Sequence, residues 1–226
     1  VTTNLCHITG NEVTYRDEPD PALGAGEVLL RIDAVGICGS DMHAYHGYDP
    51  RRVPPLILGH ELAATIVTGS QCGRRVTVNP LITCGRCEYC VSGHDNLCAN
   101  RTMIGMTRPG GFAELMSIPA ASLIDIPQDM SVTQAALTEP AATALHALNV
   151  AARALSRPLA ESRVLVLGGG AIGLLTALLL KSYGCRDIEL AETNALRRAS
   201  AALTGAGNPF DPVATPARGN AFDLGI

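Results

Sequence analysis

A dense group of cysteines near the middle of the chain constrains the fold most strongly. Four of the eight cysteines fall within fifteen positions, separated by gaps of two, two and seven residues. Four thiolates at such spacing can surround one tetrahedral zinc ion and leave no open position, which is typical of a structural site. Gaps of two residues favour metal-binding thiolates over disulfides in a chain of this size. The sequence therefore predicts a structural zinc site with the ligands Cys84, Cys87, Cys90 and Cys98.

Composition limits the classes of protein in which such a cluster can occur. A four-cysteine site alone is also compatible with a zinc ribbon in a nucleic-acid-binding or protein-binding module. The net charge of −4 and the charged fraction of 17% give no basic face for nucleic acid. The most apolar run, residues 164–180, contains four glycines and is too short to span a bilayer. The first residues lack the pattern of a signal peptide, so we expect a cytoplasmic protein with neither nucleic-acid nor membrane partners.

The amino-acid composition and the predicted secondary structure change near residue 130, which indicates two domains. Before it, short β-branched runs alternate with Gly and Pro, and the segments 27–32, 64–67 and 75–78 are expected to be strands. After it, Ala- and Leu-rich segments predict helix as far as residue 154, with Ser131 as an N-cap. We place a β-rich domain at residues 1–148 and a second domain at residues 149–226.

The second domain opens with a strand, a glycine turn, a helix and a second strand. Residues 164–167 predict the first strand, 171–183 the helix and 188–191 the second strand, which together form one βαβ unit of a parallel sheet. Residues 205–219 are expected to be loop, and residues 221–226 to begin a further strand. A dinucleotide fold needs more strands than these, so we expect the chain to be incomplete.

The turn between strand and helix matches the G-x-G-x-x-G fingerprint of dinucleotide-binding proteins. The three glycines allow, in order, a tight turn, close approach of the pyrophosphate, and packing of helix on strand. The free N–H groups of the helix N-terminus then face the phosphates. The expected cofactor contacts are Gly168, Gly170, Ala171, Ile172 and Gly173.

An acidic residue at the end of the second strand should bind the adenosine ribose. Glu192 occupies that position, whereas Asp187 begins the strand and so lies at the wrong end of the sheet. A carboxylate accepts hydrogen bonds from ribose hydroxyls and repels a 2′-phosphate, so NAD is favoured over NADP. Arg197 and Arg198 could weaken that preference, but we interpret them as solvated helix surface.

Two further motifs give the sequence a resemblance to a known family. Residues 36–43 read Gly-Ile-Cys-Gly-Ser-Asp-Met-His, and residues 59–61 read Gly-His-Glu. The four-cysteine cluster, Glu139-Pro140 and the glycine turn follow in that order. The sequence resembles the medium-chain zinc-dependent alcohol dehydrogenases, and in particular their sorbitol/polyol dehydrogenase-like branch. The resemblance implies an α/β fold, with a GroES-like catalytic domain and a Rossmann-type nucleotide domain.

The resemblance also implies a second, catalytic zinc and the residues around it. Three protein ligands and one open position suit such a site. Cys38, His60 and Glu139 match the three ligands, and Glu61 is a nearby carboxylate that contacts the metal directly or through water. Glutamate at the third position is typical of the polyol branch, where enzymes for simple primary alcohols commonly have cysteine.

Three residues of the first motif match positions that handle the proton and orient a ligand. Ser40 and His43 match a relay that passes the alcohol proton through the cofactor ribose. Asp41 matches the carboxylate that orients the zinc-binding His60. We assign Ser40, Asp41 and His43 to the catalytic set.

The implied function is oxidation of a secondary alcohol to a ketone with NAD, with zinc as a Lewis acid. Polyols or sugar acids are the favoured substrates, because Tyr45, His46 and Tyr48 flank the first motif. The alternatives are a threonine-type amino-alcohol dehydrogenase, an inactive zinc-binding fragment of such an enzyme, and a non-enzymatic zinc module. A zinc-free quinone reductase relative should lack both metal sets. The resemblance implies a homodimer or homotetramer.

Two departures from the family pattern accompany the match. The connection at residues 68–75 is shorter than the family usually shows, which predicts a reshaped surface loop. We expect that the part which completes the nucleotide sheet in the family is missing from the chain as given.

Overall fold

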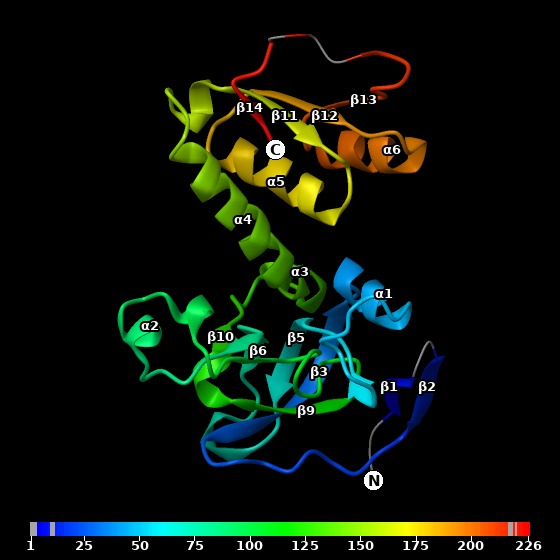
Figure 1. Cartoon of the computed structure of the whole chain (residues 1–226), viewed down its shortest axis with the longest axis vertical. Coiled ribbons are helices and arrows are strands. Elements are labelled where there is room, and N and C mark those ends of the chain that lie inside the picture. The colour runs from blue at the N-terminus through cyan, green and yellow to red at the C-terminus, as the bar shows by residue number, and fades with distance from the viewer. Residues whose placement is uncertain (1–3, 10–11, 217–218, 220) are drawn as a thin grey trace. The chain divides into compact units, whose positions relative to one another are not determined.

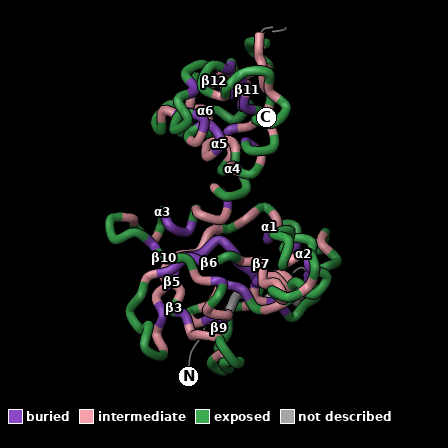
Figure 2. Tube along the Cα trace, turned by 90° about the vertical axis from the view of Figure 1, so that its left-hand side faces the viewer, coloured by how far each residue is buried: buried purple, intermediate pink, exposed green. Residues whose placement is uncertain are grey.

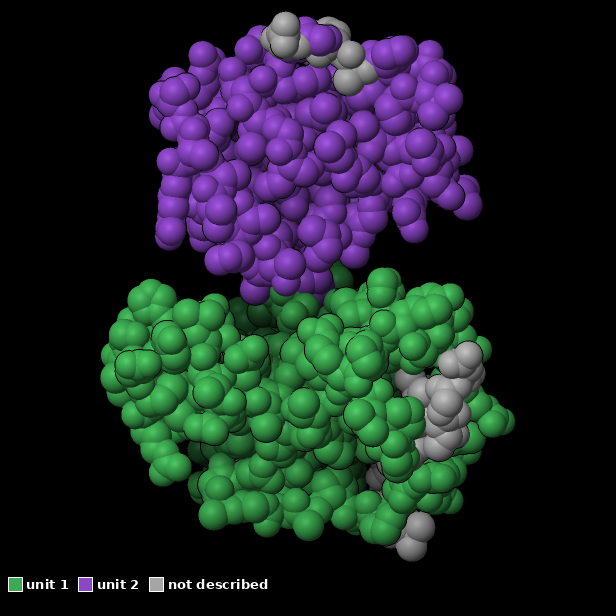
Figure 3. All heavy atoms as spheres, in the orientation of Figure 1, with its two compact units in different colours: residues 1–139 green, residues 140–226 purple. Residues whose placement is uncertain are grey.

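The structure is a computed structural model, and it describes residues 4–9, 12–216, 219 and 221–226. The chain divides into two compact units, residues 1–139 and 140–226 (Figure 3). This division lies at the start of helix α4 (Thr138–Ala152), and the domain boundary predicted at 148/149 lies further along the same helix.

The first unit is built on a five-stranded antiparallel sheet (Figure 1). Its strand order is β10-β6-β5-β3-β9, so strands distant in sequence lie side by side. The pairing of β3 with β5 shifts register between Ile32 and Ala34, a β-bulge that bends the long strand. The strands are β3 (Glu27–Gly36), β5 (Glu61–Ile66), β6 (Arg75–Val78), β9 (Leu115–Pro119) and β10 (Leu123–Asp125).

Two smaller sheets and short helices complete the first unit. One sheet has the order β2-β1-β4, and the other pairs β7 with β8. Their strands are β1 (Asn4–Thr9), β2 (Glu12–Asp17), β4 (Leu56–Ile57), β7 (Leu81–Ile82) and β8 (Thr102–Met103). The helices are α1 (Gly39–Tyr45), α2 (Glu88–Val91) and α3 (Val132–Ala136), with short 3-10 turns at Gly69–Gln71, Asp95–Leu97 and Ala120–Ser122.

The core of the first unit lies against the inner strands of the large sheet. Strand β5 is buried almost throughout, and β6 buries three of its four residues (Figure 2). Nearly continuous burial of this kind explains why both segments read as short apolar runs rather than as alternating strands. The largest fully buried side chains here are Leu30, Leu62, Ile66, Val76, Ile104, Met116 and Ile118.

The second unit contains a parallel sheet of order β13-β12-β11-β14, against which α5 packs. Pairing is parallel at all three contacts, as the βαβ pattern predicts. Helix α5 ends at Ser182, and Gly184 follows its C-cap with a φ of 85°, a conformation that favours glycine after a helix. The elements are β11 (Arg163–Leu167), α5 (Ala171–Ser182), β12 (Asp187–Ala191), α6 (Ala195–Thr204), β13 (Asn208–Phe210) and β14 (Leu224–Gly225), preceded by α4 and a 3-10 turn at Leu159–Glu161.

The sequence predictions of elements are largely confirmed. Ser131 caps α3, and its hydroxyl accepts a hydrogen bond from the Gln134 N–H at 3.2 Å. One prediction was wrong: residues 208–210, expected to be loop, form β13. Pairing with β12 supplies hydrogen bonds that outweigh the turn-forming composition of this segment. Across the described ranges, every helix is too short or too polar to cross a membrane.

Candidate functional site

Helix α1 fixes the first residues of the candidate metal centre. Cys38 is its N-cap, and the Cys38 N–H donates to the Asp41 carboxylate at 3.0 Å. This contact satisfies one of the N–H groups that a helix start leaves free. Asp41 is only 2% exposed, so the carboxylate is held beside Cys38 inside the unit.

The start of β5 supplies the other residues of this centre. His60 and Glu61 follow Gly59, whose φ is 91°. A Cβ at Gly59 would lie 2.9 Å from the Phe112 backbone nitrogen, so glycine is required on steric grounds as well. The strand β3 lies beside β5, and Gly36 leaves room for the Glu61 side chain. The Gly-His-Glu motif thus brings two potential ligands up to Cys38.

The ligand atoms of Cys38, His60 and Glu61 all lie within 4.8 Å of one another. Of the groups that lower the pKa of the Cys38 thiol, the His60 side chain has the largest effect. Burial lowers the pKa of His60, but Asp41 and Cys38 raise it more, to about 10. Burial raises the pKa of Glu61. The cluster therefore combines a thiol of lowered pKa, a histidine ring of raised pKa and a carboxyl group of raised pKa in a mostly buried place.

Glu139 lies at the start of α4, in the same compact unit. Burial raises the pKa of its carboxyl, and the negative charges of Glu61 and Asp41 raise it further, whereas His60 lowers it. Glu139 is thus close enough for the charges of His60, Glu61 and Asp41 to change its pKa. It does not belong to the group of residues whose ligand atoms lie within 4.8 Å of one another.

The donor set and its charge fit a divalent metal ion. Three carboxyl groups and a thiol surround the single His60 ring, whose raised pKa gives it a positive charge that a bound divalent ion would replace. His60 Nδ1 and Asp41 Oδ1 are buried and have no hydrogen-bond partner among the described residues. Nδ1 faces Asp41 Oδ1, so a metal ion at this centre would bind Nε2. Thiolate, imidazole and carboxylate are the ligands that zinc prefers in proteins.

Ser40 is held by an arginine that the sequence did not indicate as functional. Arg52 Nη2 donates to Ser40 Oγ at 3.0 Å, and Nη1 donates to the Ser40 carbonyl at 3.0 Å. Arg52 stands next to Arg51 in a polar loop, and such a pair reads as surface charge in a sequence. In the structure, Arg52 is 5% exposed.

His43 lies on the exposed side of α1. Its ring packs edge-on against Tyr48, with the centroids 6.4 Å apart. His46 lies between Tyr45 and Tyr48, with ring centroids 5.0 Å and 5.7 Å away. The four rings form an aromatic patch on the same short segment as Cys38, and the role of His43 in a proton relay stays a prediction.

The four predicted structural ligands converge as a second group. The sulfur atoms of Cys84, Cys87, Cys90 and Cys98 lie within 4.8 Å of one another, on the lobe between β7 and β8. The Cys87 and Cys90 sulfurs are 3.4 Å apart. The backbone N–H groups of Arg86 and Cys87 lower the pKa of Cys84, whereas the neighbouring thiols raise the pKa of Cys87. A closed four-sulfur site fits zinc.

In the second unit, the glycine turn joins β11 to α5. Gly168 has a φ of 100°, and its N–H donates to the Ala191 carbonyl at 2.8 Å. Gly170 is the N-cap of α5, and Ala171 and Ile172 form the first turn. A Cβ at Gly173 would collide with the Gly168 carbonyl oxygen. The turn thus has the tight geometry and the free helix N-terminus of a phosphate-binding loop.

Glu192 follows β12 directly and lies beside this turn. Its carboxylate accepts hydrogen bonds from the Gly169 N–H at 2.8 Å and from the Asn194 N–H at 2.7 Å. The Asn194 and Gly169 N–H groups lower the pKa of Glu192 and keep it ionised. The fingerprint pattern missed the contribution of Gly169, since it specifies only the first, third and sixth positions.

The two arginines of α6 differ in their surroundings. Arg198 donates to the carbonyls of Glu192 at 2.8 Å and Thr193 at 2.7 Å, and it pairs with Asp211 at 3.2 Å. The Arg197 side chain is 61% exposed and lies 3.8 Å from the Glu192 carboxylate. The expectation of solvated surface was therefore wrong for Arg198, which ties the end of β12 to α6.

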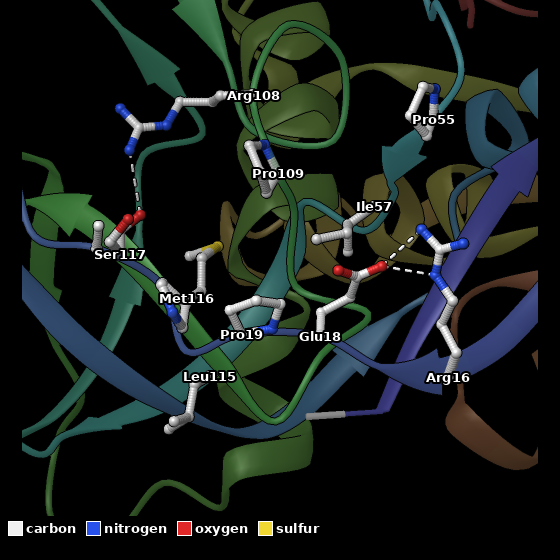
Figure 4. Close-up of a pocket in the computed structure, with 12 residues that line it drawn as sticks. Arg16, Glu18, Pro19, Pro55, Ile57, Arg108, Pro109, Leu115, Met116 and Ser117 are labelled. Atoms are coloured by element: carbon white, nitrogen blue, oxygen red, sulfur yellow. Dashed lines mark hydrogen bonds and ion pairs between the residues drawn. The ribbon is translucent and has the colours of Figure 1, made fainter. Parts of the chain in front are cut away.

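A separate cavity of about 500 Å³ lies elsewhere in the first unit (Figure 4). Its wall is largely proline and aliphatic side chains, and its charged groups are paired. Arg16 binds Glu18, and Arg108 donates to the Ser117 carbonyl at 3.2 Å (Figure 4). None of the described residues of either metal group lines this cavity.

Comparison with known proteins matches this geometry to a family. Residues 24–128 match the model of the alcohol dehydrogenase GroES-like domain. An L-threonine 3-dehydrogenase of Yersinia pestis (strain Pestoides F) is 36% identical over 190 residues, which are 80% of this chain and 54% of that protein. The chain spans about half the length of the curated relatives that it matches.

Solved structures share the fold of the chain. A zinc-binding dehydrogenase from Sinorhizobium meliloti 1021 bound to NADP has a TM-score of 0.86 and 33% identity, over 97% of this chain and 66% of that one. Galactitol-1-phosphate dehydrogenase from Escherichia coli has a TM-score of 0.82 and 26% identity, over 95% and 62%. The predicted combination of a β-rich GroES-like domain with a parallel sheet is confirmed. The chain belongs to the medium-chain zinc-dependent alcohol dehydrogenase family.

Proposed function

We propose that this chain carries the catalytic centre of an NAD-linked, zinc-dependent oxidoreductase that oxidises a secondary alcohol to a ketone. One observation carries the proposal: Cys38, His60 and Glu61 converge within 4.8 Å in a chain that also has a dinucleotide turn. A metal group alone suits a binding module, and a glycine turn alone suits many folds. Their combination suits hydride transfer.

The proposed ligands of the catalytic zinc are Cys38, His60 and Glu139, with Glu61 as a further carboxylate near the metal. When bound, zinc supplies Lewis acidity that lowers the pKa of an alcohol hydroxyl. Asp41 orients the His60 ring from its Nδ1 side. Burial of Asp41 and His60 excludes water from that side of the centre and so strengthens their interaction.

Ser40 and His43 are the proposed proton carriers. A hydroxyl can accept a proton on one side while it donates on the other, which suits a relay. The exposed ring of His43 suits the last step, release of the proton to water. Both residues lie on α1, one helical turn apart, so their spacing is fixed by the helix.

The proposed cofactor is NAD. Gly168, Gly170 and Gly173 shape the pyrophosphate site, and Ala171 and Ile172 offer N–H groups at the start of α5. The ionised Glu192 carboxylate disfavours a 2′-phosphate. Arg198 is occupied by two carbonyl groups and Asp211, so it is not free to balance that phosphate. The related Sinorhizobium meliloti structure holds NADP, which makes this preference worth measuring.

The proposed substrate is a polyol or sugar acid. The aromatic patch of His43, Tyr45, His46 and Tyr48 offers rings and polar edges to a hydroxyl-rich chain. The second candidate is a threonine-type amino alcohol, favoured by the 36% identity to an L-threonine 3-dehydrogenase. Assembly into a homodimer or homotetramer stays a prediction.

The test compares NADH formation with sorbitol, galactitol, L-threonine and ethanol on the zinc-loaded protein. We expect the polyols to be oxidised faster than ethanol, and Cys38→Ala to abolish turnover. Preference for L-threonine would select the second candidate. Zinc-loaded protein that oxidises none of these alcohols would contradict the proposed activity.

A further inference from the structure

Gly169 is a glycine that the dinucleotide fingerprint does not require. It stands between Gly168 and Gly170, at a position where the G-x-G-x-x-G pattern accepts any residue. Gly168 needs the conformational freedom of glycine, with a φ of 100°, whereas Gly169 is not among the glycines of positive φ. Its φ would therefore allow a side chain, so the neighbours of Gly169 decide whether one could stand there.

The space beside the Gly169 Cα is taken by the side chain of Glu192. Gly169 is buried in the turn. A Cβ there would lie 3.1 Å from Glu192 Cγ, 3.2 Å from Glu192 Cβ and 3.1 Å from Leu190 Cδ2. Two carbon atoms are at their optimal separation at about 3.5–4.0 Å, so the added methyl group would be crowded. The same glycine donates its N–H to Glu192 Oε2 at 2.8 Å. Gly169 thus leaves room for the methylene groups of Glu192 and binds its carboxylate.

Hydrogen bonds hold the backbone of Glu192 in place. Its N–H donates to the Phe210 carbonyl at 3.0 Å, at the end of β13. Its carbonyl accepts a hydrogen bond from Arg198 of α6 at 2.8 Å. Because the backbone is held on both sides, a methyl group at residue 169 would be relieved by movement of the Glu192 side chain.

The two carboxylate oxygens of Glu192 have different donors within the chain. Oε2 accepts the Gly169 N–H, and Oε1 accepts the Asn194 N–H at 2.7 Å. An ionised carboxylate has about two lone-pair sites on each oxygen, so one site on each oxygen remains for an outside donor. The two neighbouring hydroxyls of a ribose supply two such donors. A 2′-phosphate replaces one donor with negative charge.

We propose that Gly169 is a specificity-determining residue of the nucleotide turn, which sets the position of the Glu192 carboxylate and thereby the choice between NAD and NADP. This inference rests on the proposed function, because it deepens the assignment of the cofactor. The missing Cβ leaves space for the Glu192 methylene groups, and the N–H fixes one of the two oxygens. A side chain at residue 169 would displace the carboxylate from the arrangement that suits a ribose diol.

Arg197 indicates the direction in which the preference should change. Its Nη1 lies 3.8 Å from Glu192 Oε2, and its side chain is 61% exposed. The charge of Glu192 therefore opposes the charge of Arg197 in the present arrangement. Once the carboxylate is displaced, the guanidinium is available to a 2′-phosphate, a group that arginine binds well. Displacement of Glu192 should thus weaken the binding of NADH and not that of NADPH.

The test measures the affinities of the purified protein for NADH and NADPH by fluorescence titration, which needs no turnover. Gly169→Ala should lower the NADH affinity roughly tenfold, as expected for a lost hydrogen bond to a charged group. The NADPH affinity should stay unchanged or rise. In a Glu192→Ala background, Gly169→Ala should leave the ratio of the two affinities unchanged, because the carboxylate is already absent. An unchanged ratio in the single variant, or additive changes in the double variant, would overturn the proposal.

Gly205→Ala is the control for a second unit that is merely destabilised. Gly205 follows α6 and has a φ of 64°, so an alanine there is strained. This variant should melt at a lower temperature than the wild type but keep the wild-type ratio of NADPH to NADH affinity. If Gly205→Ala changed the ratio as Gly169→Ala does, the effect would belong to stability and the proposal would be wrong.

Failure of the inference is distinguishable from failure of the proposed function. A wild-type protein that binds neither dinucleotide would refute the proposed cofactor and, with it, the role of Gly169. NADH binding with an unchanged ratio in Gly169→Ala would refute only the role of Gly169.

A second measurement replaces the first if Gly169→Ala does not fold. The amide hydrogen of Gly169, followed by NMR, should exchange with solvent roughly tenfold faster in Glu192→Ala than in the wild type, because its acceptor is lost. Equal exchange in the two proteins would overturn the contact on which the proposal depends.

Discussion

His60 Nδ1 lies 3.6 Å from Asp41 Oδ1, and both side chains are almost fully buried. The separation exceeds a hydrogen bond, and neither atom has another hydrogen-bond partner among the described residues. The second Asp41 oxygen accepts the Cys38 N–H. The Asp41 carboxylate therefore accepts a hydrogen bond from the backbone of Cys38 and faces the ring of His60. Through these two contacts, Asp41 links the start of α1 to the orientation of the His60 ring.

Asp41→Asn should weaken metal binding while leaving the fold intact. The amide oxygen can still accept the Cys38 N–H, but the negative charge that faces His60 is lost. We expect zinc affinity to fall roughly 10- to 100-fold, measured by competition with a chromophoric chelator. Asp33→Asn, which alters an Arg31-paired carboxylate on β3, is the control and should bind zinc as the wild type does. Unchanged affinity in Asp41→Asn would show that Asp41 does not support the metal centre.

Substitutions at two glycines of the nucleotide turn should have different effects: Gly173→Ala should lower the free energy of unfolding, and Gly170→Ala should lower the affinity for the cofactor. Gly173→Ala places a Cβ against the Gly168 carbonyl, so we expect a loss of roughly 1–3 kcal/mol in the free energy of unfolding. Gly170 has a φ of −76° and open space where a Cβ would stand, so Gly170→Ala should melt at the wild-type temperature. It should nevertheless lose NADH affinity, because the added methyl blocks the pyrophosphate. Tight NADH binding by Gly170→Ala would place the cofactor elsewhere.

Glu192→Gln should change the preference between the two nicotinamide cofactors. Glutamine keeps an acceptor for only one of the Gly169 and Asn194 N–H groups, which donate to different oxygens of Glu192, and it no longer repels a 2′-phosphate. The ratio of NADPH to NADH affinity, measured by fluorescence titration, should therefore rise. Asp187→Asn, at the opposite end of β12, should leave the ratio at its wild-type value. A wild-type chain that already prefers NADPH would contradict the role given to Glu192.

Asp49 should contribute an acid-sensitive part of the stability. Hydrogen bonds from Arg51, with the charges of Arg51 and Arg52, lower its pKa to about 2 from an ordinary value of 3.8. A carboxyl whose pKa is lowered by folding stabilises the protein above its unfolded pKa, and that contribution disappears as the pH falls through the folded pKa. Asp49→Asn should be less stable than the wild type at pH 7, and urea melts should show the difference vanish between pH 3.8 and about 2. A difference that persists at the acid end would show that the loss is not electrostatic.

Much of the fold was predictable because local pattern and tertiary role coincide. The βαβ unit has strands and a helix of ordinary length, and its glycine turn can be formed by few other sequences. The four-cysteine group needs only local spacing. Segment 208–210 was not predictable, since its composition favours a loop and only pairing with β12 makes it a strand.

The residues of the candidate site were predictable where a sequence motif identifies them. They were not predictable where their role depends on a contact between segments distant in the sequence. Cys38 and His60 come from separate motifs, and only the family resemblance placed them together. Arg52 gave no signal, because nothing in an Arg-Arg pair tells which guanidinium is buried. The Gly169 N–H bond to Glu192 likewise depends on how the turn meets the end of β12.

Zinc content is the most direct test of the central claim that the chain holds two separate metal centres. Two groups of potential ligands are present, so elemental analysis of the purified protein should give two zinc ions per chain. Cys38→Ala should reduce this to one, and Cys87→Ala should also reduce it to one while retaining the ion at Cys38. One zinc ion in the wild type, unchanged by Cys38→Ala, would mean that only the four-cysteine group binds metal and that the proposed catalytic centre is wrong.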